Sequence, residues 1–379
     1  VMLSHYNIVE NVYAAQFCED IRRGDVNMAF LPYHHTFGCT GQIVMLAAGA
    51  ATAFCDGLKY LQKNIVEYKV SVFFCVPLLI ESIYKKILLT VKKEGLEGKV
   101  KFGLRLSKLL LKFGIDARRK LFKQILQQLG GNLRLVISGA SAIDPQAVEG
   151  FNQFGITAVQ GYGMTEAAPM LAAEDSAERC PGSIGKAFPG IELAIDEPNA
   201  DGIGELIARG PNIMSGYYEN PEETEKVLAG GWLHTGDLAC VNEDGFVFIC
   251  GRKKNVIVMK NGKNIFPEEI EGHIDLLPYT QQSMVFTREK HNELVLWAEI
   301  VYNPDYLKEH GISYDEFVKI VQTDMAKINE TMPSYKYVNH FILTDEPMIN
   351  TTTQKVKRNL EIEKLNANRE NEKWYNSYV

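Results

Sequence analysis

The first 160 residues alternate short apolar runs with longer stretches in which apolar residues recur at helical spacing. The apolar runs at 28–31, 51–55, 70–75 and 133–137 each end at a polar residue, Gly or Pro, which is typical of buried strands. Helices are predicted between them, one from an N-cap at Ser4 to about residue 16, others over 77–89 and 144–154. Strands that alternate with helices indicate an α/β fold with a mainly parallel sheet.

The pattern changes after residue 180. Gly and Pro become frequent, and short alternating runs at 191–195, 204–208 and 245–249 predict antiparallel strands in a small barrel-like or distorted sheet, with a turn at 199–202. After Lys254 a further unit begins, with strands at 282–287 and 294–302 and an amphipathic helix at 314–328. We therefore predict an N-terminal domain over 1–253, made of an α/β sheet part (1–160) and a β-rich part (161–253), and a small, mobile α+β C-terminal domain over 254–379.

Residues 36–55 carry no charge and are long enough on paper to span a membrane. The run contains Gly38, Gly41 and Gly49. It divides more naturally into a helix, a turn and a buried strand, and this is the prediction.

Composition limits the classes of function. The chain has 379 residues, of which 46% are apolar and 23% charged, so two or three domains with proper cores are expected. A net charge of −7 argues against nucleic acid as a partner. The seven cysteines are scattered and form no Cys-x-x-Cys pair, which favours a reducing cytoplasm and neither a zinc site nor a disulfide framework.

Residues 99–123 hold nine basic residues and one acidic residue, Asp116, among leucines and Phe113 at roughly helical spacing. Two interpretations stay open. One is a pair of amphipathic helices with a solvated basic face. The other is a peripheral surface for anionic lipid or an acidic carrier protein.

Three motifs follow one another at orderly distances. Residues 160–166 read Gln-Gly-Tyr-Gly-Met-Thr-Glu, residues 232–237 read Trp-Leu-His-Thr-Gly-Asp, and residues 251–254 read Gly-Arg-Lys-Lys, with Thr-Thr-Thr-Gln-Lys at 351–355. In this order they resemble the adenylate-forming superfamily of acyl-CoA synthetases, luciferases and peptide-synthetase adenylation domains. The stretch from Asp116 to Arg134 most resembles the long-chain fatty acyl-CoA synthetase branch.

The resemblance implies a reaction. A fatty acid is activated by ATP as an acyl-adenylate, with Mg²⁺, and the acyl group passes to coenzyme A. In that family a Gly/Ser/Thr-rich phosphate loop stands just before a segment like Val1-Met2-Leu3-Ser4-His5. The expectation is therefore a chain that lacks its N-terminal part, including the phosphate loop, and is nearly inactive by itself.

Site residues are carried over from the family motifs. Tyr162 would stack on adenine, Thr165 would contact the α-phosphate, and Glu166 would bind Mg²⁺, which prefers carboxylate and phosphate oxygens. Asp237 would hold the ribose hydroxyls, with Arg252 as a second ribose or phosphate contact. The implied nucleotide-binding residues are Gly139, Ala140, Ser141, Gly161, Tyr162, Gly163, Asp237 and Arg252.

The C-terminal matches imply a division of labour. Lys254 falls at the hinge about which the small domain swings, and Gly262 at the place where backbone lines the pantetheine tunnel. Lys355 matches the lysine inserted toward the carboxylate and α-phosphate, where a flexible ammonium acts as a mobile point charge. Because relatives show Ser-Gly-Lys where this chain has Thr-Gln-Lys, Lys357 stays an alternative.

Residues 31–38 resemble the segment that contributes to the acyl pocket, which implies His35 and Gly38, together with Met164, as lining residues. The adjacent His34 and His35 invite a metal interpretation. Neighbours on a strand point to opposite faces, and no third ligand is apparent, so no metal site is expected there.

The sequence thus predicts an AMP-forming acyl-CoA synthetase, cytoplasmic or membrane-peripheral. An acyl-carrier-protein ligase would share every motif, and a non-catalytic nucleotide- or acyl-binding fragment is the alternative from another class. Chain length of the acid and oligomeric state are not specified.

Overall fold

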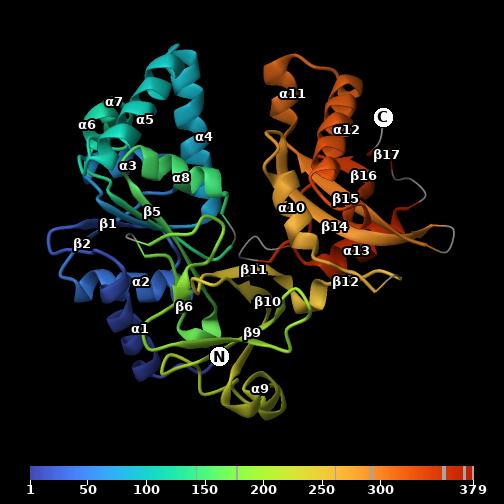
Figure 1. Cartoon of the computed structure of the whole chain (residues 1–379), viewed down its shortest axis with the longest axis horizontal. Coiled ribbons are helices and arrows are strands. Elements are labelled where there is room, and N and C mark those ends of the chain that lie inside the picture. The colour runs from blue at the N-terminus through green and yellow to red at the C-terminus, as the bar shows by residue number, and fades with distance from the viewer. Residues whose placement is uncertain are drawn as a thin grey trace. The chain divides into compact units, whose positions relative to one another are not determined.

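The computed structural model describes residues 1–379 except 142, 176, 177, 261, 291, 292, 352–355, 370–372, 378 and 379 (Figure 1). The chain divides into two compact units. The first comprises Val1–Thr235 and Ala239–Ile249, and the second Gly236–Leu238 and Cys250–Val379. The boundary between the two domains that we predicted at residue 254 is not tested by this division and stays a prediction.

A seven-stranded sheet forms the centre of the first unit. Its strand order is β2-β1-β3-β4-β5-β6-β7, and neighbours are parallel from β2 to β5, while β6 and β7 are antiparallel additions. The strands are β1 (Val26–Ala29), β2 (Ala51–Phe54), β3 (Val72–Cys75), β4 (Leu135–Ser138), β5 (Thr157–Gly163), β6 (Met170–Ala173) and β7 (Lys186–Ala187). The predicted mainly parallel α/β sheet is confirmed.

Helices cover both faces of this sheet (Figure 1). They are α1 (His5–Cys18), α2 (Thr36–Ala47), α3 (Leu61–Glu67), α4 (Pro77–Lys93), α5 (Glu97–Lys112), α6 (Arg118–Leu121), α7 (Lys123–Gln128) and α8 (Pro145–Gln153). On one face Phe73 and Val136 pack with residues of α3, α4, α7 and α8. On the other face Val72 and Leu135 pack with residues of α1 and α2. Alternate residues of one strand therefore serve two cores, as the period of a strand requires.

The uncharged run at 36–55 does form a helix, a turn and a strand, α2 followed by β2. The expectation of a buried strand was wrong, because β2 stands at the edge of the sheet and both Ala51 and Phe54 are exposed. No described helix has the length and apolar character that crossing a membrane requires.

A second sheet follows, with strand order β11-β10-β9-β8. Its strands are β8 (Glu192–Asp196), β9 (Gly204–Arg209), β10 (Leu233–Val241) and β11 (Val247–Arg252), and α9 (Pro221–Val227) lies between β9 and β10 in sequence. The predicted turn joins β8 to β9, where the Asn199 side chain accepts hydrogen bonds from the backbone N–H groups of Asp201 and Ile203.

The second unit is built on a four-stranded sheet, β14-β15-β16-β17, in which only β15 and β16 are parallel. Its elements are β12 (Ile257–Val258), β13 (Asn264–Ile265), α10 (Pro267–Asp275), β14 (Thr280–Lys290), β15 (Glu293–Tyr302), α11 (Pro304–His310), α12 (Tyr314–Glu330), β16 (Val338–Thr344), α13 (Arg358–Ala367) and β17 (Trp374–Asn376). A capping box of Ser313 and Glu316 starts α12. Phe317, Val321 and Met325 then recur every four residues and are fully buried against the sheet.

Candidate nucleotide and acyl site

Two predicted nucleotide motifs meet at the carboxyl edge of the parallel sheet. Strands β4 and β5 are parallel neighbours, with Ser138 opposite Gln160. One residue beyond that pair, a Cβ on Gly139 would lie 3.4 Å from the Gly161 carbonyl oxygen and 3.2 Å from the Phe37 ring. Ala140 has a φ of 81°, and both it and Ser141 are exposed. Ligands of open α/β sheets bind at such carboxyl ends.

The motif itself is tightly packed at Gly163. Strands β5 and β6 pair with a register shift between Tyr162 and Gly163, and a Cβ on Gly163 would collide with the carbonyl oxygen of Pro169. Backbone atoms cannot move aside as a side-chain end can. Glycine is therefore required here by close approach of two backbone segments.

Three side chains from distant parts of the chain hold the segment after the motif, residues 167–170. The Asn212 amide donates to the carbonyl oxygens of Ala167 (2.7 Å) and Met170 (2.8 Å), and the Asn11 amide donates to the same two oxygens. The Thr40 hydroxyl donates to the Ala168 carbonyl oxygen at 3.1 Å. All three side chains are buried. Residues 167–170 are thus held by side chains of α1, of α2 and of the loop between β9 and α9, which carries Asn212.

Glu166 is half-buried and accepts a hydrogen bond from the Tyr217 hydroxyl at 2.9 Å. Burial, together with this bond to Glu166, raises the pKa of Tyr217 far above its usual range, so the phenol stays a donor. Thr165 is exposed, and Tyr162 and Met164 are half-buried. A carboxylate oriented in this way suits a role as one ligand of a phosphate-bound Mg²⁺, and that role stays a prediction.

Asp237 and Arg252, both in the second unit, lie side by side. The Arg252 Nε is 2.8 Å from Oδ1 of Asp237, and the Asp237 side chain is 7% exposed. The two residues expected at the ribose are therefore neighbours in space, although 15 positions separate 237 from 252. An ion pair of this kind fixes the carboxylate for acceptance of hydroxyl hydrogens.

The predicted acyl-pocket residues fall in different surroundings. Gly38 lines a small cavity of about 10 Å³ with Gly41 and Phe74. Gly41 and Phe74 also line a larger apolar cavity of about 40 Å³ that reaches Gly161. His35 and Met164 line neither of these two cavities.

The strand expected to carry His34 and His35 is absent from this described stretch. His35 is instead the N-cap of α2, and the two imidazole rings lie 4.3 Å apart. The two rings therefore lie together and not on opposite faces, so that expectation was wrong. A turn, unlike a strand, lets successive side chains meet.

The residues assigned to domain movement and thiol transfer lie at the surface. Lys254 is exposed in the short helix η4 (Lys253–Asn255). Gly262 is exposed in the turn between β12 and β13, with a φ of 77°, and a Cβ there would meet no atom within 4 Å. The turn closes through hydrogen bonds between Gly262 and Met259 and between Met259 and Lys263.

Lys355 lies outside the described residues, so its role as the adenylation lysine stays a prediction. The chain on both sides of it is fixed. Asn350 and Val356 form an antiparallel bridge, and Glu361, fully buried in α13, accepts a hydrogen bond from the Ile349 N–H at 2.6 Å. Lys357, the alternative, donates its backbone N–H to the Ile349 carbonyl oxygen.

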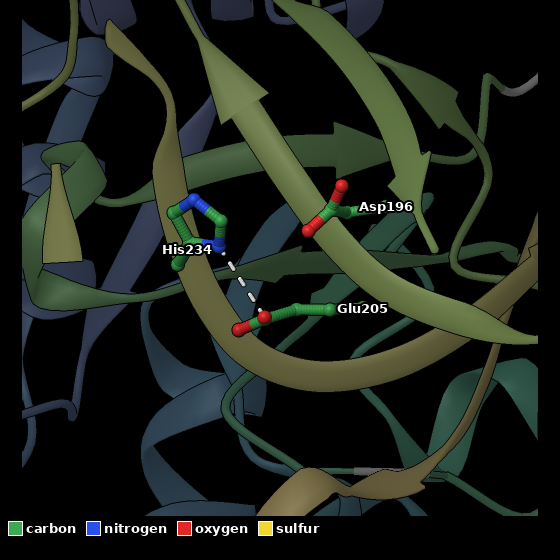
Figure 2. Close-up of side chains that lie close together, drawn as sticks. All are labelled: Asp196, Glu205 and His234. Carbon is green, nitrogen blue, oxygen red and sulfur yellow. Dashed lines mark hydrogen bonds and ion pairs between the residues drawn. The ribbon is translucent and has the colours of Figure 1, made fainter. Parts of the chain in front are cut away.

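A separate polar cluster lies in the sheet of β8, β9 and β10. Figure 2 shows Asp196, Glu205 and His234, whose potential ligand atoms lie within 4.8 Å of one another. Asp196 and Glu205 are opposite residues of β8 and β9, and Nδ1 of His234 is 3.3 Å from Oε2 of Glu205. Imidazole and carboxylates are ligand types that zinc accepts. Because the Glu205 contact already engages the imidazole, we interpret the cluster as a polar brace between strands.

Asn11, Thr40, Asn212 and Tyr217 were not predicted from sequence as site residues. Asn7 and Asn11, four positions apart on α1, are both buried, and Asn7 donates to the carbonyl oxygens of Pro211 and Ile213. Two asparagines four positions apart on one predicted helix were the available signal. Their partners are about 150 to 200 positions away in sequence, so the signal did not reveal what they bind.

Comparison with known proteins agrees with this geometry. The AMP-binding enzyme family matches residues 1–218, and the AMP-binding enzyme C-terminal domain matches residues 254–371. The peroxisomal long chain acyl-CoA synthetase 6 of Arabidopsis thaliana is 31% identical over 83% of this chain and 47% of its own length. Long-chain-fatty-acid–CoA ligase 5 of Rattus norvegicus is 29% identical over 94% of this chain and 57% of its own length.

Solved structures show the same fold. The O-succinylbenzoate coenzyme A synthetase of Bacillus subtilis in complex with AMP superposes with a TM-score of 0.70 at 19% identity, covering 95% of this chain and 65% of that one. ATP-bound MatB of Rhodopseudomonas palustris gives 0.70 at 23% identity, covering 96% and 65%.

A two-domain α/β protein with a nucleotide motif at the carboxyl edge of a parallel sheet is the class that the fold and site define. More particularly, the chain belongs to the AMP-binding enzyme family. It spans about half the length of the curated relatives that it matches.

Proposed function

We propose that the chain is part of an AMP-forming acyl-CoA synthetase. The reaction joins a fatty acid to AMP with release of pyrophosphate, then transfers the acyl group to the thiol of coenzyme A and releases AMP. The long-chain synthetases among its relatives support the substrate class. The observation that carries the proposal is the meeting of Gly139 and Gly161 at the sheet edge, because it joins two separate nucleotide motifs at one place.

Catalysis in this proposal is positioning and charge stabilisation. Thr165 contacts the α-phosphate, and Glu166, held by Tyr217, binds the Mg²⁺ that neutralises phosphate charge. Asp237, held by Arg252, accepts the ribose hydroxyls. Lys355 supplies a positive charge to the carboxylate and α-phosphate during adenylation.

The test is AMP binding by calorimetry. We expect AMP to bind the chain, and Asp237→Ala to weaken binding about 10- to 100-fold, since it removes a charged acceptor of two hydroxyl hydrogens. Glu192→Ala, which breaks the exposed Glu192–Arg209 pair instead, is the matched control and keeps wild-type affinity. Unchanged AMP affinity in a folded Asp237→Ala protein would remove Asp237 from the ribose role.

By itself the 379-residue chain is expected to turn over slowly. Each preorganised donor lost at a developing charge lowers the rate about 10²- to 10³-fold, and a phosphate loop supplies several. Pyrophosphate release at the same rate with and without an added phosphate-loop segment would contradict this. The same result would show that the chain is not a non-catalytic binding fragment. Transfer of the acyl group to an acyl carrier protein in place of coenzyme A would instead favour the acyl-carrier-protein ligase.

A further inference from the structure

The outer face of α5 carries a basic ridge. Lys101, Arg105, Lys108 and Lys112 follow one another at intervals of four, three and four residues, which places them in one line along a helix. All four are exposed, and no ion pair joins any of them to another described residue. Nor does any Asp or Glu occur from residue 98 to residue 115. The ridge is therefore a line of positive charge, with Glu97 one turn before it and Asp116 just after the helix, on a chain of net charge −7.

An apolar ridge runs beside it. Phe102, Leu109 and Phe113 repeat the same spacing, displaced by one residue, with Leu106 half-buried between them. Phe102 is 67% exposed, Leu109 53% and Phe113 74%. Large apolar side chains exposed in a row mark an interaction surface more often than solitary ones do.

The opposite side of the helix explains why this face is free. Gly103 and Ser107 are buried, and a Cβ on Gly103 would lie 3.2 Å from the Phe122 ring of the neighbouring segment. Val100 and Leu104 pack against the core shared with α4 and α8. The inner face is thus fully used by the fold of the first unit, and the helix cannot rotate to bury Phe102 or Leu109.

We propose that the outer face of α5, from Lys101 to Phe113, binds the surface of an anionic phospholipid bilayer. The 16-residue helix is about 24 Å long and would lie in the plane of the interface. Lysine and arginine side chains reach toward headgroup phosphates while their stems stay apolar, and the phenyl and leucine groups enter the acyl boundary. An acidic protein would satisfy the basic ridge but offers no layer for the parallel apolar one. This inference does not depend on catalysis.

The experiment is sedimentation of the 379-residue chain with vesicles of phosphatidylcholine, with or without phosphatidylglycerol. We expect binding to the anionic vesicles, much weaker binding to phosphatidylcholine alone, and a fall in binding as salt rises. Each basic residue near an anionic surface contributes about fivefold in affinity, so the triple variant Lys101→Gln, Arg105→Gln, Lys108→Gln should lose on the order of 100-fold. Phe102→Ser with Leu109→Ser and Phe113→Ser should lose a similar factor.

A matched variant keeps the net charge change but places it elsewhere. Lys226→Gln, Lys308→Gln and Lys319→Gln alter three exposed lysines on α9, α11 and α12 and should bind vesicles as the wild type does. All substitutions are at exposed positions, and a thermal melt confirms that each variant is folded.

Failure of the wild type to sediment with anionic vesicles would overturn the proposal, as would equal loss in the matched variant. Capture of an acidic protein through α5 without any vesicle binding would also overturn it. If the serine variant changed the oligomeric state and left vesicle binding intact, the face would be a self-association surface and the proposal would be wrong.

Discussion

The loop at 161–166 in the first unit and the turn at 259–263 in the second both depend on a glycine, and for opposite reasons. A side chain on Gly163 would strike the backbone of Pro169. A side chain on Gly262 would meet nothing, and only its φ of 77° opposes one. The first is a problem of space between two chain segments, the second of local conformation.

This difference matches the roles proposed for the two regions. The segment just after the loop assigned to the nucleotide, residues 167–170, is held by the side chains of Asn11, Thr40 and Asn212, so the end of the loop is anchored before a ligand arrives. Preorganised donors need no rearrangement at the moment of reaction. The turn assigned to the pantetheine path is exposed at Gly262, and two backbone hydrogen bonds, from Gly262 to Met259 and from Met259 to Lys263, close it. It can meet a ligand from solvent without any rearrangement of the core.

The largest expected effect is at Gly163. Gly163→Ala forces β5 away from the chain at Pro169 and should lower the free energy of unfolding by about 3 kcal/mol or more, with loss of AMP binding. Gly272→Ala, in α10 with no atom near the added Cβ, is the control and should stabilise by about 0.5–1 kcal/mol. Denaturant unfolding of both variants measures the contrast. If the Gly163→Ala protein were as stable as the wild type, close packing would not be the reason for glycine at position 163.

A second contrast uses the same substitution at two buried carboxyl groups. Glu361 is fully buried, accepts the Ile349 N–H and pairs with Lys364, so Glu361→Gln should destabilise by about 1–3 kcal/mol. Glu19 is buried with Oε2 unpartnered, and burial, then the nearby Asp175 and Glu174, raises its pKa well above the ordinary value. Glu19→Gln should therefore stabilise the fold at neutral pH, by a similar amount.

The pH dependence at Glu19 follows from the direction of its shift. Between the unfolded pKa near 4.5 and the raised folded value, the folded state binds more protons than the unfolded state. The wild type should lose stability as pH rises through this window, and Glu19→Gln should flatten the loss. Thermal melts from pH 5 to pH 8 provide the measurement. Equal slopes for the two proteins would show that Glu19 does not titrate there.

The smallest effect on stability is expected at Gly262. Gly262→Leu places a side chain in the left-handed region and should cost about 1–2 kcal/mol, whereas Gly262→Asn, which tolerates that region, should cost less. In a protein that carries a phosphate loop joined to this chain, Leu should obstruct acyl transfer to coenzyme A and spare adenylate formation. Lys355→Ala should do the reverse. Two half-reactions slowed equally by either change would contradict the proposed division of labour.

Sequence patterns predicted the elements that local periodicity controls. The helix at 314–328 and the strand at 294–302 agree closely with α12 and β15, because capping and alternation are local properties. The exposure of β2 was not predicted, since a strand's place in the sheet depends on which strands pair with it. The contacts of Asn11 and Asn212 with Met170 were also out of reach, because they join distant segments. The sequence motifs identified Gly161 and Asp237 as site residues. The structure adds the neighbours that position them, Gly139 beside Gly161 and Arg252 beside Asp237.

The exposed edge strand β2 has a consequence for handling the protein. Its outer side presents backbone donors and acceptors that no strand of the described residues uses, and Phe54 lies exposed beside them. The 20 residues from Thr36 to Cys55 contain no lysine, glutamate or other charged residue to discourage pairing with a second copy. Concentrated solutions should therefore be prone to pairing through this edge, and a charge placed on β2 at Ala51 should improve solubility.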